Sequence, residues 1–457
     1  MNGKELLLKA IQGHHTTRPA WVPFVGVHGG KLLGVTATEY LKSADLIVQG
    51  LERAHELYRP DGLPIVFDLQ MEAEILDCKL LWANEVPPSV VSHPLMDAGR
   101  IGDLPEFDVT QGRFPLVREA TQRLAKRLGG DIGLYGLITG PFTLVSHLRG
   151  SEVFLDMLMD PDKVKEMMAF ATEVGKKTAE FYLESGCDII AVVDPMTSQI
   201  SSAHFAEFVS PYLNELFAHV KVRGGFSSLF VCGDATRNLE VMCRTSCDNL
   251  SVDENIPLEL LCHLARRSGK SAGGNLKLTS VLLLGKPADS MLDAIRCIDT
   301  GGTAGFILAP GCDLPYGTPE ANLQAVAAMV HDEYQRQVAR TTVVVTDMGP
   351  FDDIKLPNFA QEKAVIVDCI TLDSAACAPC LYTLDAALRA AERANVAVEV
   401  REHKIKSREG IGYMANMGVK NIPAICIDGE PKFISIIPDT DTLVKAIEDK
   451  AREMGKT

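Results

Sequence analysis

The sequence predicts an α/β protein in which a barrel of eight parallel strands is followed by a smaller α/β domain. Three observations support this: a length of 457 residues, a composition with 46% hydrophobic and 23% charged residues, and short apolar runs that alternate with helical segments up to about residue 340. The length exceeds one ordinary core, the composition is globular, and the alternation is typical of βα units. We expect a barrel over residues 1–340, a linker over 341–360 and a second domain over 361–457.

Eight apolar, β-rich runs are the expected strands of the barrel. They cover residues 20–28, 62–69, 131–138, 187–194, 226–232, 247–253, 270–275 and 303–310. The stretches between them fit helices; residues 161–185, for example, open with proline at a first turn and continue with apolar residues at helical spacing. The alternative is a doubly wound open sheet, but a count of eight strands favours a closed barrel.

Charge and cysteine usage limit the classes of partner. The net charge of −15 arises from 60 acidic and 45 basic residues, and such a surface repels phosphate backbones and anionic lipid. The N-terminus has no signal-peptide pattern, and no apolar run approaches membrane length. We expect a cytoplasmic protein without nucleic-acid or membrane partners. Twelve cysteines occur singly except for one CxxC pair, so special cysteines are expected to be metal ligands or redox thiols.

Polar and sulfur-containing residues occupy the carboxyl ends of the expected strands, the face that forms the active site in barrels of this kind. The candidates are His28, Asp68, Asp194, Cys232, Asp253, Asn275 and Cys312. Singly, each aspartate could cap a helix, His28 could be a turn residue and a cysteine could pack as a small hydrophobe. Their convergence on one end of the barrel favours a functional site.

Several segments resemble the methylcobalamin:coenzyme M methyltransferase branch of the uroporphyrinogen decarboxylase superfamily. The resemblance covers roughly the first 335 residues and includes Asp194-Pro195, Phe230-Val231-Cys232-Gly233-Asp234, Ser251-Val252-Asp253-Glu254, Gly274-Asn275 and Ala309-Pro310-Gly311-Cys312-Asp313. It implies a TIM barrel that moves a methyl group between a corrinoid and a thiol or similar acceptor. Because the chain lacks a DxHxxG corrinoid motif, a corrinoid protein or free cobalamin would be the partner.

The resemblance also assigns roles to the candidate residues. Asp68 matches the aspartate with which uroporphyrinogen decarboxylases hold pyrroles, and we expect Asp68 and Asp194 to be catalytic. His28, Asp253, Asn275 and Pro423 are expected to bind substrate. Porphyrinogen decarboxylation is the less favoured reaction, because the N-terminal stretch that carries arginines in those enzymes has only Arg18 here.

Zinc is the expected cofactor. In the methyltransferase branch a His-x-Cys pair and a later cysteine bind zinc, which activates the accepting thiol. The matching cysteines are Cys232 and Cys312, but Phe230 stands at the histidine position. Catalytic zinc sites use thiolate, imidazole or carboxylate ligands and keep one position open. Either the metal has been lost, or another rim group completes the site: His28, Asp194, Asp253 or Glu254.

The C-terminal segment carries Cys377-Ala378-Pro379-Cys380 between an expected strand over 363–371 and a helix. At a helix N-terminus, free amides and the dipole lower the pKa of the first cysteine. The CxxC and the later Val419-Lys420-Asn421-Ile422-Pro423 resemble a thioredoxin-fold domain. This resemblance implies that Cys377 attacks, that Cys380 resolves, that Pro423 follows a cis bond and faces the CxxC, and that a thiol-disulfide reductase is a partner.

The leading hypothesis is a corrinoid-dependent methyltransferase with a zinc site and a fused dithiol domain that maintains or supplies reduced thiol. Three alternatives stay open at this point. The chain could bind a corrinoid or tetrapyrrole without turnover, as the phenylalanine at position 230 allows. It could also be a decarboxylase-type lyase, or a thiol-disulfide oxidoreductase acting through its tail.

Overall fold

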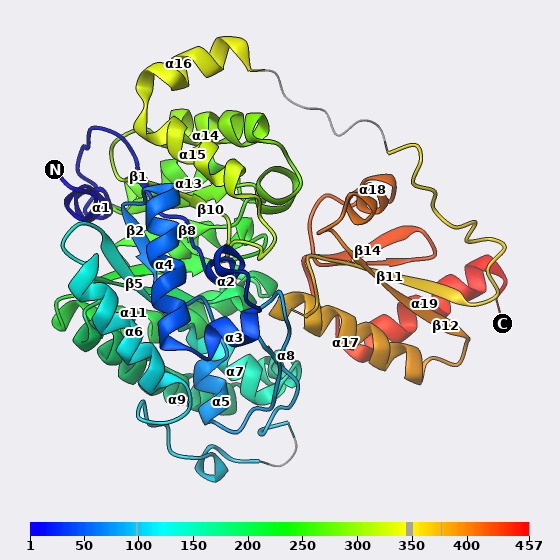
Figure 1. Ribbon diagram of the computed structural model, residues 1–457. Coiled ribbons are helices and arrows are strands. Elements are labelled where there is room, and N and C mark those ends of the chain that lie inside the picture. The colour runs from blue at the N-terminus through cyan, green and yellow to red at the C-terminus, as the bar shows by residue number, and fades with distance from the viewer. Residues whose placement is uncertain (97–98, 344–350, 376, 457) are drawn as a thin grey trace.

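The computed structural model of the protein describes residues 1–96, 99–343, 351–375 and 377–456. It contains a barrel domain and a second, C-terminal sheet domain that lies against one end of the barrel (Figure 1). The predicted linker over 341–360 falls partly on residues 344–350, which lie outside the described residues.

Eight parallel strands form the sheet of the first domain. In the order β1-β10-β9-β8-β7-β6-β5-β2, they comprise β1 (Ala20–Trp21), β10 (Phe306–Pro310), β9 (Ser271–Leu276), β8 (Asn249–Val252), β7 (Phe226–Val231), β6 (Ile189–Val193), β5 (Gly133–Thr139) and β2 (Gly62–Pro64). Each strand overlaps one of the eight predicted runs, so the prediction of a parallel eight-stranded α/β barrel is confirmed. The first two strands are shorter than expected.

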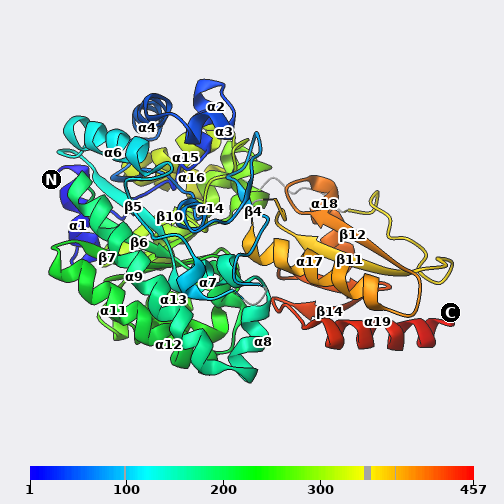
Figure 2. The ribbon, with the colours of Figure 1, turned by 90° about the horizontal axis from the view of Figure 1, so that it is seen from below.

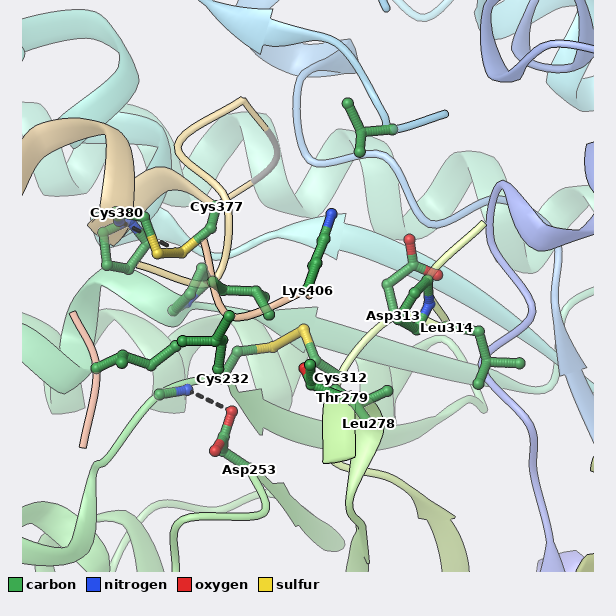
Figure 3. A pocket seen from close by; sticks show the side chains of 18 of the residues that line it. Cys232, Asp253, Leu278, Thr279, Cys312, Asp313, Leu314, Cys377, Cys380 and Lys406 are labelled. Atoms are coloured by element: carbon green, nitrogen blue, oxygen red, sulfur yellow. Dashed lines mark hydrogen bonds between the residues drawn. A yellow bond between two sulfur atoms is a disulfide. The ribbon is translucent and has the colours of Figure 1, made fainter. Parts of the chain in front are cut away.

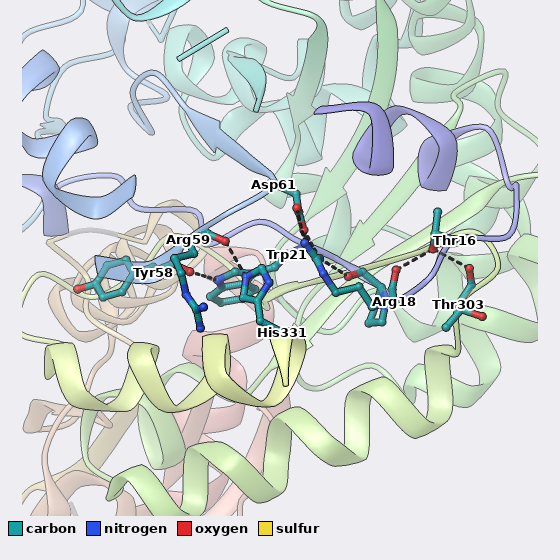
Figure 4. A network of polar contacts seen from close by, with 9 residues as sticks. Thr16, Arg18, Trp21, Tyr58, Arg59, Asp61, Thr303 and His331 are labelled. Carbon is teal, nitrogen blue, oxygen red and sulfur yellow. Dashed lines mark hydrogen bonds and ion pairs between the residues drawn. The ribbon is translucent and has the colours of Figure 1, made fainter. Parts of the chain in front are cut away.

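A polar network joins the two ends of this sheet at the amino ends of β1 and β2 (Figure 4). The amide of Asp61 donates to the carbonyl of Trp21 at 2.8 Å, and the Asp61 carboxylate accepts from the Trp21 amide at 2.8 Å. Arg18 forms a two-pronged ion pair with the same carboxylate, at 2.5 and 2.8 Å. Because both the backbone and this buried carboxylate bridge the strands, the sheet is nearly closed.

Helices cover the outside of the barrel. They are α1 (Gly3–Ile11), α2 (His28–Leu33), α3 (Ala37–Leu41), α4 (Ala44–Tyr58), α5 (Met71–Ile75), α6 (Phe114–Arg127), α7 (Pro141–Arg149), α8 (Glu152–Met159), α9 (Pro161–Ser185), α10 (Ser202–His204), α11 (Ser210–Val222), α12 (Leu239–Cys243), α13 (Leu258–Arg267), α14 (Pro287–Gly301), α15 (Glu320–His331) and α16 (Glu333–Thr342). Along the described ranges, no helix combines the length and apolar character needed to cross a bilayer.

The longest helix, α9, has the bounds that the sequence predicts, and the reasons are local. The Asp160 side chain accepts from the Lys163 amide, Pro161 occupies the first turn, and Gly186 ends the helix at a φ of +111°, a conformation that favours glycine. One predicted boundary is wrong, because His28 begins α2 rather than ending a strand. The last helix of the domain, α16, is capped by Asp332, whose side chain accepts from the Gln335 amide.

The C-terminal domain has its own sheet and core. Its elements are β11 (Val365–Thr371), α17 (Ala378–Arg393), β12 (Val398–Lys404), α18 (Arg408–Asn416), β13 (Ala424–Ile427), β14 (Glu430–Ile434) and α19 (Thr440–Met454). The strand order is β12-β11-β13-β14, with β12 parallel to β11 and the other pairs antiparallel. Buried residues of α17, α19 and the sheet pack together, including Val367, Ala387, Ile425 and Leu443.

The two domains are held together through the N-terminal end of α17 and the loops beside it (Figure 2). Tyr382 of α17 is 2% exposed and belongs to the hydrophobic core of the barrel, where its hydroxyl donates to the carbonyl of Ser146 at 2.9 Å. Asn421 donates to Asp234 at 2.7 Å, and Arg237 donates to the carbonyl of Ser435 at 2.6 Å. The C-terminal domain therefore sits on the carboxyl ends of the barrel strands.

Candidate functional site

A pocket of about 320 Å³ lies where the C-terminal domain meets the mouth of the barrel (Figure 3). Both domains line it. The barrel contributes loops at the carboxyl ends of β7, β8, β9 and β10, and the C-terminal domain contributes the CxxC segment and the residues after β12 and before β13. Its polar and sulfur-containing lining includes Cys232, Asp253, Glu254, Thr279, Cys312, Asp313, Cys377, Cys380 and Lys406.

Cys232 and Cys312 form the floor of this pocket. They follow β7 and β10, which are separated in the sheet by β8 and β9. Their sulfurs form a disulfide with Cα atoms 5.8 Å apart. Both side chains are half-buried. The barrel thus brings together two cysteines that are 80 positions apart in the chain, at the face where the sequence places the active site.

Cys377 and Cys380 form a second disulfide at the opposite wall of the pocket (Figure 3). Cys377 is the N-cap of α17, and the amide of Cys380 donates to the Cys377 sulfur at 3.3 Å. Cys380 is fully buried, whereas Cys377 is half-buried. Pro423 follows a cis peptide bond and also lines the pocket. Cys377 is therefore the more accessible sulfur of the pair.

Two carboxyl groups after β8 flank the barrel cysteines. Asp253 accepts from the Gly233 amide at 2.9 Å and from the side chain of Asn255 at 2.6 Å, and burial raises its pKa. Glu254 accepts from the amide of Leu278. Burial and the neighbouring Asp253 raise the pKa of Glu254 to about 8. Glu254 can consequently take up or release a proton near neutral pH, in the range suited to thiol chemistry.

Asp313 and Lys406 add a second proton carrier and a positive charge to the pocket that Cys312 lines, and Figure 3 shows the Lys406 amine directed away from the Cys232–Cys312 disulfide. Burial raises the pKa of Asp313 well above its usual range, while Lys406 acts in the opposite direction. Among the described residues, Asp313 Oδ1 is buried without a hydrogen-bond partner. Lys406 pairs with Asp373 at 3.1 Å. Among the described residues that line the pocket, Lys406 is the one lysine or arginine, and three carboxyl groups, Asp253, Glu254 and Asp313, have raised pKa values.

The two predicted catalytic aspartates lie next to the pocket rather than in its lining, as far as the described residues show. Asp68 forms a buried ion pair with Arg113. Asp194 accepts from the Thr143 amide and hydroxyl at 2.8 and 2.6 Å and from the Phe142 amide at 3.2 Å, and burial raises its pKa to about 6. Their visible contacts hold the barrel rim in place.

His28 and Asn275 are likewise engaged in internal contacts. The His28 ring contacts the Tyr58 hydroxyl at 2.8 Å and the Tyr316 carbonyl at 3.0 Å, and burial lowers its pKa to about 4. Asn275 donates to the carbonyls of Asp253 and Ile256 at 3.1 and 2.7 Å. Of the predicted barrel residues, Cys232, Cys312 and Asp253 line the pocket, whereas His28 and Asn275 support its loops.

The donor set around Cys232 and Cys312 does not fit a zinc ion. Within the described ranges, no group of three or more histidine, cysteine, aspartate or glutamate side chains is placed to hold a metal. Phe230 is buried in the barrel interior, with its ring centre 4.8 Å from that of Phe24 and 5.9 Å from that of Phe67. Both nitrogens of His28 already have partners. Asp253 and Glu254 share the pocket with the two sulfurs, but among the described residues neither completes a group of three metal ligands with them.

Three pocket residues lay outside the predicted set of site residues. The sequence suggests Glu254 only as a metal ligand. Asp313 directly follows Cys312, and this position in the sequence is a signal that could identify it. Lys406 has no such signal, because it reaches the pocket from the C-terminal domain after β12. Its role depends on how the two domains dock.

Known proteins resemble the barrel domain of this chain. The uroporphyrinogen decarboxylase (URO-D) family model matches residues 2–333. A methylcobamide:CoM methyltransferase MtbA of Methanosarcina acetivorans is 26% identical over 70% of this chain and 95% of that relative. A methylated-thiol–coenzyme M methyltransferase of Methanosarcina mazei is 28% identical over 62% of this chain and 74% of that relative.

Among solved structures, a methyltransferase from Methanosarcina mazei superposes with a TM-score of 0.66. It is 24% identical and covers 73% of this chain and 99% of its own. This likeness supports the barrel fold. The C-terminal domain lies outside the residues that the family model matches.

Proposed function

We propose that this chain, which belongs to the uroporphyrinogen decarboxylase (URO-D) family, is a methyltransferase that moves a methyl group from a methylcorrinoid to a thiol. The observation that carries this proposal is the similarity of nearly the whole barrel to methylcobamide:CoM methyltransferases. The pocket supports it, because it lies at the carboxyl ends of the strands, where barrel enzymes carry out their chemistry. A corrinoid protein or free methylcobalamin is the donor, and a small thiol is the acceptor.

Thiol activation is assigned to residues of the chain itself, because the donor set does not fit zinc. Glu254, with a pKa of about 8, takes the proton of the acceptor thiol, whose own pKa is about 8.5 when free. The sulfur lone pair forms the new S–CH₃ bond as the carbon–cobalt bond of the donor breaks, and the corrinoid keeps that electron pair. Lys406 supplies positive charge for an anionic acceptor.

The size of the pocket limits what it can hold while the C-terminal domain is docked. About 320 Å³ is at the lower end of small-ligand sites, so it suits a small thiol and not a corrin ring. The donor would therefore present its methyl group after the C-terminal domain has moved away from the barrel mouth.

A demethylation assay tests the proposal. Full-length protein is mixed with methylcobalamin and 2-mercaptoethanesulfonate, and cobalt demethylation is followed by absorbance, with methylated thiol measured by mass spectrometry. We expect protein-dependent conversion that falls in Glu254→Gln and is retained in Glu259→Gln, which changes an exposed glutamate on α13. Binding of cobalamin without any conversion would instead favour a non-catalytic corrinoid-binding protein and reject the proposal.

Two observations bear on the other functions considered. Arg18 is bound to Asp61 at the amino ends of the strands, away from the pocket (Figure 4), which leaves porphyrinogen decarboxylation without its expected arginine. The C-terminal domain is proposed to be thioredoxin-like. Its order β11-α17-β12-α18-β13-β14-α19, the CxxC at the start of α17 and the cis Pro423 support that assignment.

A further inference from the structure

Four of the twelve cysteines line the same pocket, two from each domain. Cys232 and Cys312 form one disulfide, and Cys377 and Cys380 form the other. Figure 3 shows the two disulfides facing each other across the pocket. From this placement we infer that the C-terminal dithiol exchanges disulfides with the barrel, so that the Cys232–Cys312 pair is a redox substrate of Cys377 and Cys380 in the same chain.

The remaining cysteines provide an internal contrast. All eight are free and buried: Cys78, Cys187, Cys243, Cys247, Cys262, Cys297, Cys369 and Cys426. Burial raises the pKa of each of these thiols, which suppresses the reactive thiolate. By contrast, the three cysteines that are only half-buried, Cys232, Cys312 and Cys377, all line the pocket. Core packing accounts for the eight buried cysteines, but it does not explain why the other four cysteines line one pocket.

Specific contacts hold the two disulfides in the same space. Asn421, two residues before Pro423, donates to Asp234, two residues after Cys232, at 2.7 Å. Ser89 of the barrel donates to the carbonyl of Ala375, just before the CxxC. These bonds fix the loop of each redox pair directly to the other domain. The docking surface therefore presents the CxxC to the barrel cysteines rather than to bulk solvent.

The CxxC has the asymmetry that exchange requires. The half-buried Cys377 faces the pocket and accepts a hydrogen bond from the Cys380 amide at the start of α17, an arrangement that favours its thiolate. Cys380 lies behind it, fully buried. Lys406, which also lines the pocket, adds positive charge. Cys377 is the attacking sulfur and Cys380 the resolving one.

The exchange balances within the chain. An external dithiol reductant first converts the Cys377–Cys380 disulfide to two thiols. The Cys377 thiolate then attacks one sulfur of the Cys232–Cys312 disulfide: a mixed disulfide forms, and the other barrel cysteine leaves as a thiolate. Cys380 attacks Cys377, which restores the CxxC disulfide and releases the second barrel thiolate. Two electrons pass to the barrel, and the two protons lost by the CxxC are matched by two taken up by the barrel thiols.

One consequence rests on the proposed function. Reduction changes a disulfide on the floor of the methyl-transfer pocket into two thiols, which alters both the space and the charge offered to the acceptor. The C-terminal domain would therefore set the redox state in which the barrel works. The exchange itself is measured without methyl transfer, so its failure is distinguishable from failure of the methyltransferase proposal.

Trapping the mixed disulfide is the direct test. Full-length Cys380→Ser protein is reduced, oxidised with a limiting amount of diamide, alkylated and digested, and disulfide-linked peptides are identified by mass spectrometry. We expect Cys377 to be linked to Cys232 or Cys312, because the resolving thiol is absent. The Cys377→Ser/Cys380→Ser double variant should lack this link. Cys369→Ser, at a buried cysteine of β11, should behave as the unsubstituted protein does.

A kinetic measurement covers the case in which the trapping variant fails to fold. Oxidised unsubstituted protein and the Cys377→Ser/Cys380→Ser variant are each exposed to about 0.1 mM dithiothreitol, and free Cys232 and Cys312 are counted over time by alkylation. Because linked domains meet at millimolar effective concentration, the unsubstituted protein should be reduced roughly tenfold faster. Equal rates would overturn the inference. The inference would also be overturned if the barrel cysteines of the Cys380→Ser protein resisted alkylation until a chelator was added, because a metal would then hold them.

Discussion

Replacing Tyr382 with alanine should release the C-terminal domain from the barrel. The side chain is 2% exposed and packs in the barrel core, not in the core of its own domain, so its removal costs docking free energy. A buried tyrosine covers about 150 Å² or more, worth about 4 kcal/mol at roughly 25 cal/mol per Å². Loss of the hydrogen bond to the Ser146 carbonyl adds about 1 kcal/mol. The total of about 5 kcal/mol corresponds to a docking equilibrium shifted by roughly 4,000-fold.

Small-angle X-ray scattering and thiol alkylation measure this shift. The Tyr382→Ala protein should have a larger radius of gyration, and Cys377 should be alkylated faster after mild reduction. Tyr382→Phe is the matched control: it keeps the ring and loses only the hydrogen bond, so its docking should weaken by about 1 kcal/mol. An alanine variant with an unchanged scattering profile and an unchanged alkylation rate would refute the view that this residue anchors the domain.

Three further outcomes are expected. Phe230→His restores a His-x-Cys pattern, and the reduced variant should gain stoichiometric zinc by elemental analysis, whereas Phe230→Leu, which tests loss of packing alone, should not. In Glu254→Gln, the rate of methyl transfer should fall by roughly a hundredfold. In the unsubstituted protein this rate should rise through pH 8, where Glu254 loses its proton, whereas in the variant the pH dependence of the rate should follow only the ionisation of the acceptor thiol. The pKa of Asp194 is about 6 in the folded chain, which is above its unfolded value, so the folded chain binds more protons than the unfolded chain between about pH 4 and 6. The free energy of unfolding therefore falls as pH rises through this range, by up to roughly 3 kcal/mol. Urea denaturation at several pH values should show this decline for the unsubstituted protein and not for Asp194→Asn.

The barrel was predictable because its signals are local and repeated. Each strand overlaps an apolar run, and α9 matches its predicted bounds because an N-cap, a proline and a glycine mark its ends. The first strand was overestimated. Residues after Trp21 are apolar and buried, as strand residues would be, yet the chain turns there toward α2. Composition alone does not distinguish a buried strand from a buried turn.

The site was only partly predictable, for a different physical reason. Strand ends and motif spacing place Cys232, Asp253 and Cys312 correctly at the barrel mouth. They do not reveal that Asp68 is neutralised by Arg113, which comes from the N-terminal end of α6. Nor do they show that Lys406 enters from another domain. Hydrogen-bond partners and domain docking depend on contacts between distant segments, and a single sequence carries no direct record of those.

Docking of the C-terminal domain has opposite effects on the two proposed activities. Exchange with the barrel needs Cys377 close to Cys232 and Cys312, whereas a corrin ring needs the barrel mouth that this domain covers. The two steps should therefore alternate, and a bound corrinoid should compete with the mixed disulfide. Excess methylcobalamin, without any thiol acceptor, should slow formation of the Cys377-linked peptide in Cys380→Ser protein. The Tyr382→Ala substitution should weaken exchange while easing access for the corrinoid. If methylcobalamin left the rate of linkage unchanged although it bound the chain, the corrinoid would enter by another route and the barrel mouth would serve exchange alone.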